Sequence, residues 1–196
     1  MKKLYVFVIT IVMCALMPTY ARAGLFIDFT GNILKPADTG YAKIFGDTIF
    51  YPEVMTGIKI YKDFYIYGAY GFLNVKGNII DAESGVRVTS NQNFISVGMG
   101  YEFMSDKIIS MKISGGVIFV NYSGKAYLSD SLIDDDSGAR TGYKFDIGAF
   151  CHITRYINVG IVTGYFHAQN TKDYPRKLSY GGLKSGISLS IRLKEN

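Results

Sequence analysis

The feature that most constrains this chain is a strict alternation of residue types near its C-terminus. Between Leu183 and Leu193, one set of alternate residues is almost wholly apolar, and the other is small or charged. Successive side chains of a β-strand point to opposite faces, so a period of two predicts a strand with one apolar and one polar face. The apolar face holds Leu183, Ser185, Ile187, Leu189, Ile191 and Leu193, and the polar face Lys184, Gly186, Ser188, Ser190 and Arg192.

The same alternation recurs along the chain. A further segment, residues 64–75, carries Tyr and Phe on both faces, so its register is left open. Beyond the first residues, no apolar stretch is as long as the ~18 to 20 residues that a membrane-spanning helix needs. The sequence therefore predicts eight strands. The other alternating segments are residues 25–33, 54–61, 94–103, 109–119, 142–153 and 157–165.

The links between the predicted strands alternate in length. Short turns and long polar links follow one another, which is typical of membrane barrels with tight turns on one side and long loops on the other. In lipid, an open sheet would leave unpaired backbone groups at its edges, so the sheet must close. The predicted fold class is all-β, an eight-stranded antiparallel up-and-down transmembrane β-barrel. Short turns are expected at residues 61–63, 104–107 and 154–155, and long links at 35–53, 76–93, 123–140 and 168–181.

The polar faces of the strands suit the inside of such a barrel. Eight strands enclose a space just wide enough to be filled by side chains. Charged residues inside must pair or meet water, because removing an ion from water costs several kcal/mol. We therefore predict an interior ion-pair network and no wide pore. Its expected members are Asp28, Lys59, Glu102, Lys112, Lys144, Asp146, Lys184 and Arg192.

A soluble, lipocalin-like barrel would show the same alternation, with its apolar face turned inward. Three features favour the membrane barrel: the links alternate in length, the proposed outer faces carry almost no charge, and aromatic residues gather near strand ends. Such gathering is typical of the aromatic girdles at membrane interfaces. The expected girdle residues are Tyr61, Tyr65, Tyr67, Tyr101, Phe103, Tyr143, Tyr156 and Tyr165.

The N-terminus has the pattern of a secretory signal peptide. Two lysines follow Met1, an apolar run covers residues 4–16, and Ala21 and Ala23 stand at the small-residue positions before a cleavage point. This run is too short to span a membrane as a helix. We expect residues 1–23 to be a signal peptide. An uncleaved anchor is the alternative.

Removing the signal peptide leaves residues 24–196 as one outer-membrane barrel domain. It also removes three basic residues, which lowers the formal charge from +5 to +2, so the composition gives no argument for nucleic-acid binding. Only Cys151 then remains, and an internal disulfide is impossible. Cys14 would be the site of lipid modification if the leader were of the lipoprotein type, but Met13 precedes it where a small residue is usual.

The alternation, the link lengths and the last strand together resemble the small outer-membrane barrels of the OmpA transmembrane-domain and OmpX type. The resemblance covers about residues 24–193. The family's C-terminal assembly signal places a polar residue, a glycine and alternating hydrophobics in the last strand, and the matching residues here are Lys184, Gly186, Leu189 and Ile191. The resemblance implies recognition by the barrel-assembly machinery. Family members usually end in Phe, whereas this chain ends Leu193-Lys194-Glu195-Asn196.

Some small barrels are lipid A enzymes, so the histidines are the candidates for catalysis. His167 lies near the outer end of the seventh strand, but Gln169 stands where a nucleophilic Ser would be required. His152 is expected to face inward near a short turn, at the wrong end for such an enzyme. The acidic run at residues 134–136 lacks the glycine and glutamate spacing of a calcium loop. We therefore expect no enzyme, no metal and no cofactor.

The function that these patterns favour is non-enzymatic, with a structural or surface-interaction role in the bacterial outer membrane. Exposed loops on a rigid scaffold commonly carry binding. Expected partners are outer-membrane lipid and lipopolysaccharide, the assembly machinery, and an extracellular or host ligand, with the protein acting as a monomer. A narrow ion or small-solute channel, a lipid A-modifying enzyme and a soluble periplasmic carrier are the alternatives. The loop residues expected to bind are Asp134, Asp135, Asp136, Lys172, Arg176 and Lys177.

Overall fold

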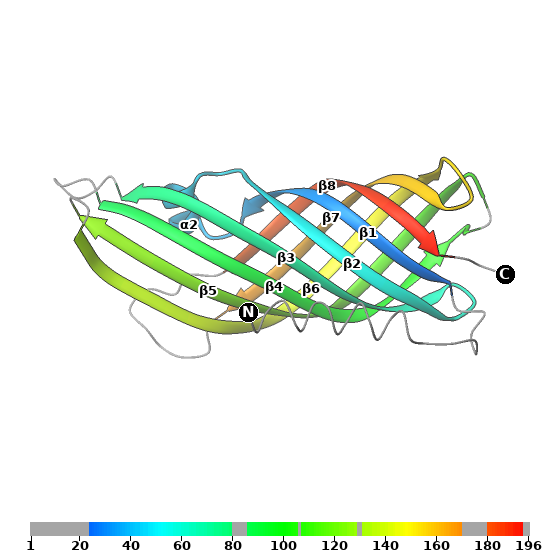
Figure 1. Cartoon of the computed structure of the whole chain (residues 1–196), viewed down its shortest axis with the longest axis horizontal. Helices are drawn as coiled ribbons and strands as arrows, with labels where there is room; N and C mark the ends of the chain where they lie inside the picture. The colour runs from blue at the N-terminus through cyan, green and yellow to red at the C-terminus, as the bar shows by residue number, and fades with distance from the viewer. Residues whose placement is uncertain (1–23, 80–85, 106, 129–130, 170–179, 194–196) are drawn as a thin grey trace.

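The computed structural model describes residues 24–79, 86–105, 107–128, 131–169 and 180–193, and it contains a closed β-barrel in this part of the chain (Figure 1). The strands follow one another around the barrel in sequence order, and every neighbouring pair is antiparallel. The predicted fold class is confirmed. Its elements are β1 (Leu25–Pro36), α2 (Thr39–Phe45), β2 (Ile49–Tyr61), β3 (Phe64–Ile79), β4 (Val86–Phe103), β5 (Ile109–Leu128), β6 (Ser131–His152), β7 (Ile157–Gln169) and β8 (Tyr180–Leu193).

Closure of the barrel depends on the pairing of the first and last strands. Leu25 lies opposite Ile58 of β2 on one side and opposite Leu193 of β8 on the other. The β1–β8 pairing continues as far as Pro36 opposite Gly182. Because each strand has a partner on both sides at membrane depth, backbone N–H and C=O groups there are satisfied without water.

The faces of the strands are those that the alternation predicts. On β4, for example, Ile95, Val97 and Met99 are exposed on the outside, while Ser96 and Glu102 are buried inside. The register of β3, which the sequence left open, places Tyr65, Tyr67, Ala69 and Leu73 inside and Phe64, Ile66, Tyr70 and Phe72 outside.

The prediction of the aromatic girdle is therefore wrong for two of its residues. Tyr65 and Tyr67 are 1% and 5% exposed, and they pack inside the barrel rather than at the membrane interface. On a strand with aromatic residues on both faces, residue type alone does not identify the outer one. The other expected girdle residues lie on the outer face or at the short turns, as Tyr61, Tyr143 and Tyr156 do, all exposed.

The short turns are confirmed, but two of the long links are wrong. Residues 76–93 and 123–140 are largely strand, because β3 and β4 continue to Ile79 and from Val86, and β5 and β6 continue to Leu128 and from Ser131. Figure 1 shows these four strands reaching well past the others at one end of the barrel. Beyond the lipid, a strand needs no apolar face, so its sequence resembles a polar loop.

The link at residues 35–53 contains helix α2. Asp38 caps the helix, because its side chain accepts a hydrogen bond from the backbone N–H of Tyr41 at 2.9 Å. Gly46 ends it with a φ of 98°, a conformation that favours glycine. No helix among the described residues is long and apolar enough to cross a membrane.

Candidate functional site

The middle of the barrel interior holds two lysines and two carboxylates. Glu53 accepts from Lys144 Nζ at 2.8 Å and lies 3.1 Å from Lys184 Nζ. Asp146 lies 3.2 Å from Lys144 Nζ and 3.0 Å from Lys184 Nζ. Each lysine therefore meets both carboxylates, and the four groups, which we call the central tetrad, carry no net charge. All four side chains are buried.

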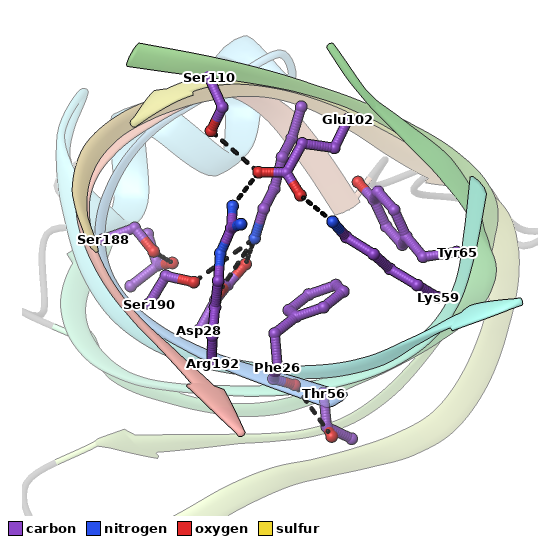
Figure 2. A network of polar contacts seen from close by, with 12 residues as sticks. Phe26, Asp28, Thr56, Lys59, Tyr65, Glu102, Ser110, Ser188, Ser190 and Arg192 are labelled. Atoms are coloured by element: carbon purple, nitrogen blue, oxygen red, sulfur yellow. Dashed lines mark hydrogen bonds and ion pairs between the residues drawn. The ribbon is translucent and has the colours of Figure 1, made fainter. Parts of the chain in front are cut away.

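A second ionic group lies toward the end with the short turns, the periplasmic end in barrels of this kind. The carboxylate of Glu102 lies between the ammonium of Lys59, at 3.2 Å, and the guanidinium of Arg192, and it also accepts from the hydroxyl of Ser110 at 2.9 Å (Figure 2). Lys59 also approaches Asp63 of the adjacent turn at 3.6 Å. Two cations and a hydroxyl thus converge on one buried carboxylate.

The remaining predicted pair lies beside this group. Lys112 Nζ contacts both carboxylate oxygens of Asp28, at 3.2 and 3.0 Å, and both side chains are buried. The same ammonium lies 4.0 Å from the ring centre of Phe26 and 4.6 Å from that of Phe150. Ring faces attract cations, so these aromatic residues add to the compensation for the lost hydration of the lysine.

All eight predicted interior residues lie inside the barrel, but they form two separate groups. Asp28, Lys59, Glu102, Lys112 and Arg192 gather near the short turns, and the others join the central tetrad. The sequence prediction missed Glu53, which it placed at the end of a long link. Extending the alternation of β2 by one more period would have put Glu53 on the same face as Lys59.

Apolar side chains fill the interior around the ionic groups. Phe26, Tyr65, Tyr67 and Ala69 form one cluster between them, and Lys144 Nζ lies 6.0 Å from the Tyr67 ring centre. A larger cluster closes the long-loop end of the barrel and includes residues of α2. Its buried members are Leu34, Tyr41, Ile49, Tyr51, Leu73, Phe94, Ile118, Val120, Tyr122, Phe166, Ala168 and Tyr180.

Helix α2 caps this apolar plug through one tyrosine. The Tyr41 hydroxyl accepts from Gln92 Nε2 at 2.6 Å, and its ring packs against Phe45 and Tyr180. Burial disfavours the charged form of the phenol and raises the pKa of Tyr41 to about 12. The helix is therefore docked into the barrel mouth by packing and a hydrogen bond.

Aromatic rings inside the barrel lie over glycines of neighbouring strands. A Cβ atom at Gly100 would overlap the ring of Tyr65, and one at Gly98 would lie 2.8 Å from the ring of Tyr67. Real Cβ atoms do not approach so closely, so these rings occupy space that only glycine leaves open. A small pocket remains near the short turns, lined by Gly24, Leu25, Phe26, Lys59, Glu102, Arg192 and Leu193.

Among the described residues, the hydroxyl beside His152 is not available as a nucleophile. His152 Nε2 lies 3.0 Å from the hydroxyl of Ser110, but this hydroxyl is fully buried and donates to Glu102. A nucleophile needs a free hydroxyl within reach of substrate. His167 lies on the outer face in a row of rings with Tyr143 and Tyr165. No group of three potential metal-binding side chains occurs among the described residues.

The residues expected to bind in loops are placed differently from the prediction. Asp134, Asp135 and Asp136 belong to the extended part of β6 rather than to a loop, and all three are exposed. Asp135 lies 3.9 Å from Lys125 of β5. Lys172, Arg176 and Lys177 lie outside the described residues.

The residues that match the assembly signal point to both sides of β8. Lys184 is buried in the central tetrad, and Gly186 faces inward, where a Cβ atom would meet Asn32. Leu189 and Ile191 point outward on the lipid-facing side. The polar and glycine positions of the signal thus face the barrel interior, while its hydrophobic positions face the membrane.

Comparisons with known proteins identify the architecture. No protein-family model and no curated protein sequence matches the chain. Among solved structures, it is similar to the outer membrane protein OprG of Pseudomonas aeruginosa, with 9% identity, a TM-score of 0.62, and coverage of 87% of this chain and 96% of that one. A major outer membrane protein of Thermus thermophilus matches with 9% identity, a TM-score of 0.59 and coverage of 87% and 99%.

The N-terminal β-barrel domain of Pseudomonas aeruginosa OprF matches with 13% identity, a TM-score of 0.51, and coverage of 87% and 97%. At such identities the likeness concerns the fold, and it confirms at this level the resemblance seen in the sequence. The outer face of the barrel is apolar, and its inner face holds the charged residues. This fold and this exterior are those of a small membrane-spanning β-barrel, as in the outer membrane proteins to which the chain is similar.

Proposed function

We propose that the protein is a closed, non-enzymatic barrel that contributes to the outer membrane as a rigid body and acts through its extracellular surface. The observation that carries this proposal is the filled interior. Two ionic groups alternate with two apolar clusters along the barrel, and the long-loop end is closed by the plug around Tyr51, Phe94 and Phe166.

The same observation disfavours the channel alternative. Ions cross a membrane through water or through polar groups that exchange for water, and a plug of packed rings offers neither. The ring centres of Phe94 and Phe166 are only 5.2 Å apart, and Tyr51 packs against both. An enzyme that uses His152 is disfavoured because Ser110, the hydroxyl beside it, is buried and already donates to a carboxylate.

Within the part of the chain that the structure describes, the surface that we expect to act is the part of β3 to β6 that extends beyond the other strands. We expect its partners to be outer-membrane lipid or an extracellular ligand, and the outward residues of β8 to be read by the assembly machinery. Because every strand at membrane depth is paired within the chain, no strand there requires a second copy, and we expect a monomer.

Planar-bilayer recording of the refolded protein tests the closed interior. We expect no single-channel steps from the natural sequence. The control is a variant in which Tyr51, Phe94 and Phe166 are changed to Ala, because removing the rings should open a path and produce conductance. Discrete steps from the natural sequence, at the size given by the opened variant, would contradict the proposal.

Incubation with lipid A tests the enzyme alternative separately. We expect no change in the mass of the acyl chains. Turnover that is lost in His167→Ala would show that the outer-rim histidine is catalytic, and the non-enzymatic part of the proposal would then be wrong.

A further inference from the structure

Four strands continue past the rim of the barrel as a sheet of their own. The pairing of β2 with β3 ends at Gly71, and the pairing of β7 with β6 begins at Thr141. Beyond these points β3, β4, β5 and β6 pair only with one another among the described strands. We call this part, residues 72–79, 86–93, 121–128 and 131–140, the extension (Figure 1).

The outward face of the extension carries two rows of side-chain amides and hydroxyls, with Phe72 and Ala139 at the two ends of the first row. In the register of the sheet, Asn93 lies opposite Asn121, and Asn91 lies opposite both Asn74 and Ser123. Ser137 continues the second row opposite Ser123. We call these six residues, Asn74, Asn91, Asn93, Asn121, Ser123 and Ser137, the amide face.

The amide face is continuous with the lipid-facing belt. The outward residues one rung closer to the membrane are Tyr70, Ile95 and Phe119, which are exposed and apolar or aromatic. The Tyr70 hydroxyl donates to Asn93 Oδ1 at 2.8 Å, which joins the two surfaces directly. Tyrosines of this kind mark the level of the lipid headgroups, so the amide face begins where the headgroups lie.

Basic residues stand on the next rungs of the same face. Lys76 and Lys125 both lie opposite Thr89, and Arg87 lies opposite Tyr127 one rung beyond. Lys125 has an exposed partner, Asp135, at 3.9 Å, a contact that is worth little in water. The face therefore presents neutral hydrogen-bonding groups at headgroup level with cations immediately above them.

We propose that the amide face binds the anionic saccharide headgroups of glycolipids in the outer leaflet, and this rests on the proposed function as a closed barrel that acts through its surface. Amides and hydroxyls both donate and accept, as ring hydroxyls of sugars require. Lys76, Arg87 and Lys125 attract phosphate or carboxylate groups. Phe72, exposed opposite Asn93, lies at the membrane-side edge of this face and continues the apolar belt, so the polar rows begin directly above it.

The test uses the full barrel refolded in vesicles of three compositions. These are phosphatidylethanolamine alone, the same lipid with phosphatidylglycerol, and the same lipid with lipopolysaccharide at equal negative charge. The readout is the temperature at which the folded band is lost on gel electrophoresis. We expect the highest midpoint with lipopolysaccharide, a smaller gain with phosphatidylglycerol, and none with the zwitterionic lipid alone.

Two variants distinguish the contribution of the basic residues from that of the amides. In K76E/R87E/K125E we expect neither phosphatidylglycerol nor lipopolysaccharide to raise the midpoint temperature of unfolding. In N74A/N91A/N121A we expect the gain from phosphatidylglycerol to remain and the additional gain from lipopolysaccharide to disappear. The matched control is K62E/K107E/R155E, which makes the same change of charge at the exposed short turns and should keep both gains.

The proposal is overturned if lipopolysaccharide stabilises no more than phosphatidylglycerol, if the amide variant behaves like the natural sequence, or if the short-turn control loses as much as the charge variant. The deacylated saccharide added in solution to zwitterionic vesicles should give no gain, and a full gain would show a soluble glycan rather than a lipid as the source. The bilayer recordings above are independent of these outcomes, so failure here leaves the closed barrel untouched.

Discussion

Replacing Glu53 by Gln tests the central tetrad. The change keeps the size of the side chain but leaves Lys144 and Lys184 with Asp146 as their only carboxylate in the tetrad. The lost contacts are 2.8 and 3.1 Å long, and at an effective dielectric constant of about 20 each attraction is worth roughly 5 to 6 kcal/mol. Removing the carboxylate charge returns several kcal/mol of desolvation cost, so we expect a net loss of about 3 to 5 kcal/mol in the free energy of unfolding.

Urea unfolding in phospholipid vesicles, followed by circular dichroism because the chain has no Trp, measures this loss. Asp135→Asn is the control, because it breaks an exposed ion pair and should cost less than about 1 kcal/mol. Combining Glu53→Gln with Lys184→Met restores a neutral set, so the double variant should be about 1 to 3 kcal/mol more stable than additivity predicts. A cost for Glu53→Gln equal to that of the control, or an additive double variant, would refute the reasoning.

Three further predictions concern other parts of the barrel. Gly100→Val should prevent the heat-resistant folded band on gels, because its side chain meets the Tyr65 ring, whereas Gly115→Ala, with 3.7 Å of clearance on the outer face, should leave the band intact. Cys151 points outward on β6 near a short turn, so in vesicles it should react with a membrane-permeant maleimide and resist a charged one until the barrel is unfolded; equal rates would place it in water. Since the pKa of Tyr41 is raised from 10.0 to about 12, its neutral form stabilises the fold below pH 10, and this stability is lost as pH rises from 10 to 12. Tyr41→Phe should therefore flatten the loss of stability over that pH range, and an unchanged profile would show that the hydroxyl does not titrate there.

The lipid-facing strands could be predicted from the sequence because the membrane imposes a requirement on every second residue. An outward residue at membrane depth must be apolar, and an inward one is free to be polar, so alternation reports both depth and direction. This requirement ends at the rim. Residues 76–79, 86–93 and 123–128 are strands that the sequence-based prediction assigned to loops, because nothing outside the lipid keeps one of their faces apolar.

The interior could be predicted only in part. The charged residues stood out against the small residues around them, and all eight lie inside. The inward rings did not stand out, because Phe94 and Phe150 look like lipid-facing residues that happen to fall on the wrong face. Glu53 was missed for a related reason: it lies at the boundary between a clear alternation and a polar link. Which lysine meets which carboxylate depends on strand tilt and stagger, which alternation does not encode.

The rings that lie over glycines have a consequence for how this barrel reaches its final pairing. A register shift of one residue between neighbouring strands turns every side chain of the shifted strand to the wrong face, which places polar residues in lipid and is unfavourable. A register shift of two residues keeps every side chain on its correct face and carries no such cost. Between β3 and β4 it would, however, place Tyr67 opposite Ser96 in one direction or Tyr65 opposite Glu102 in the other, so one ring always meets a side chain. The glycines opposite the two rings thus disfavour a two-residue register shift, which the alternation of polar and apolar residues alone would allow.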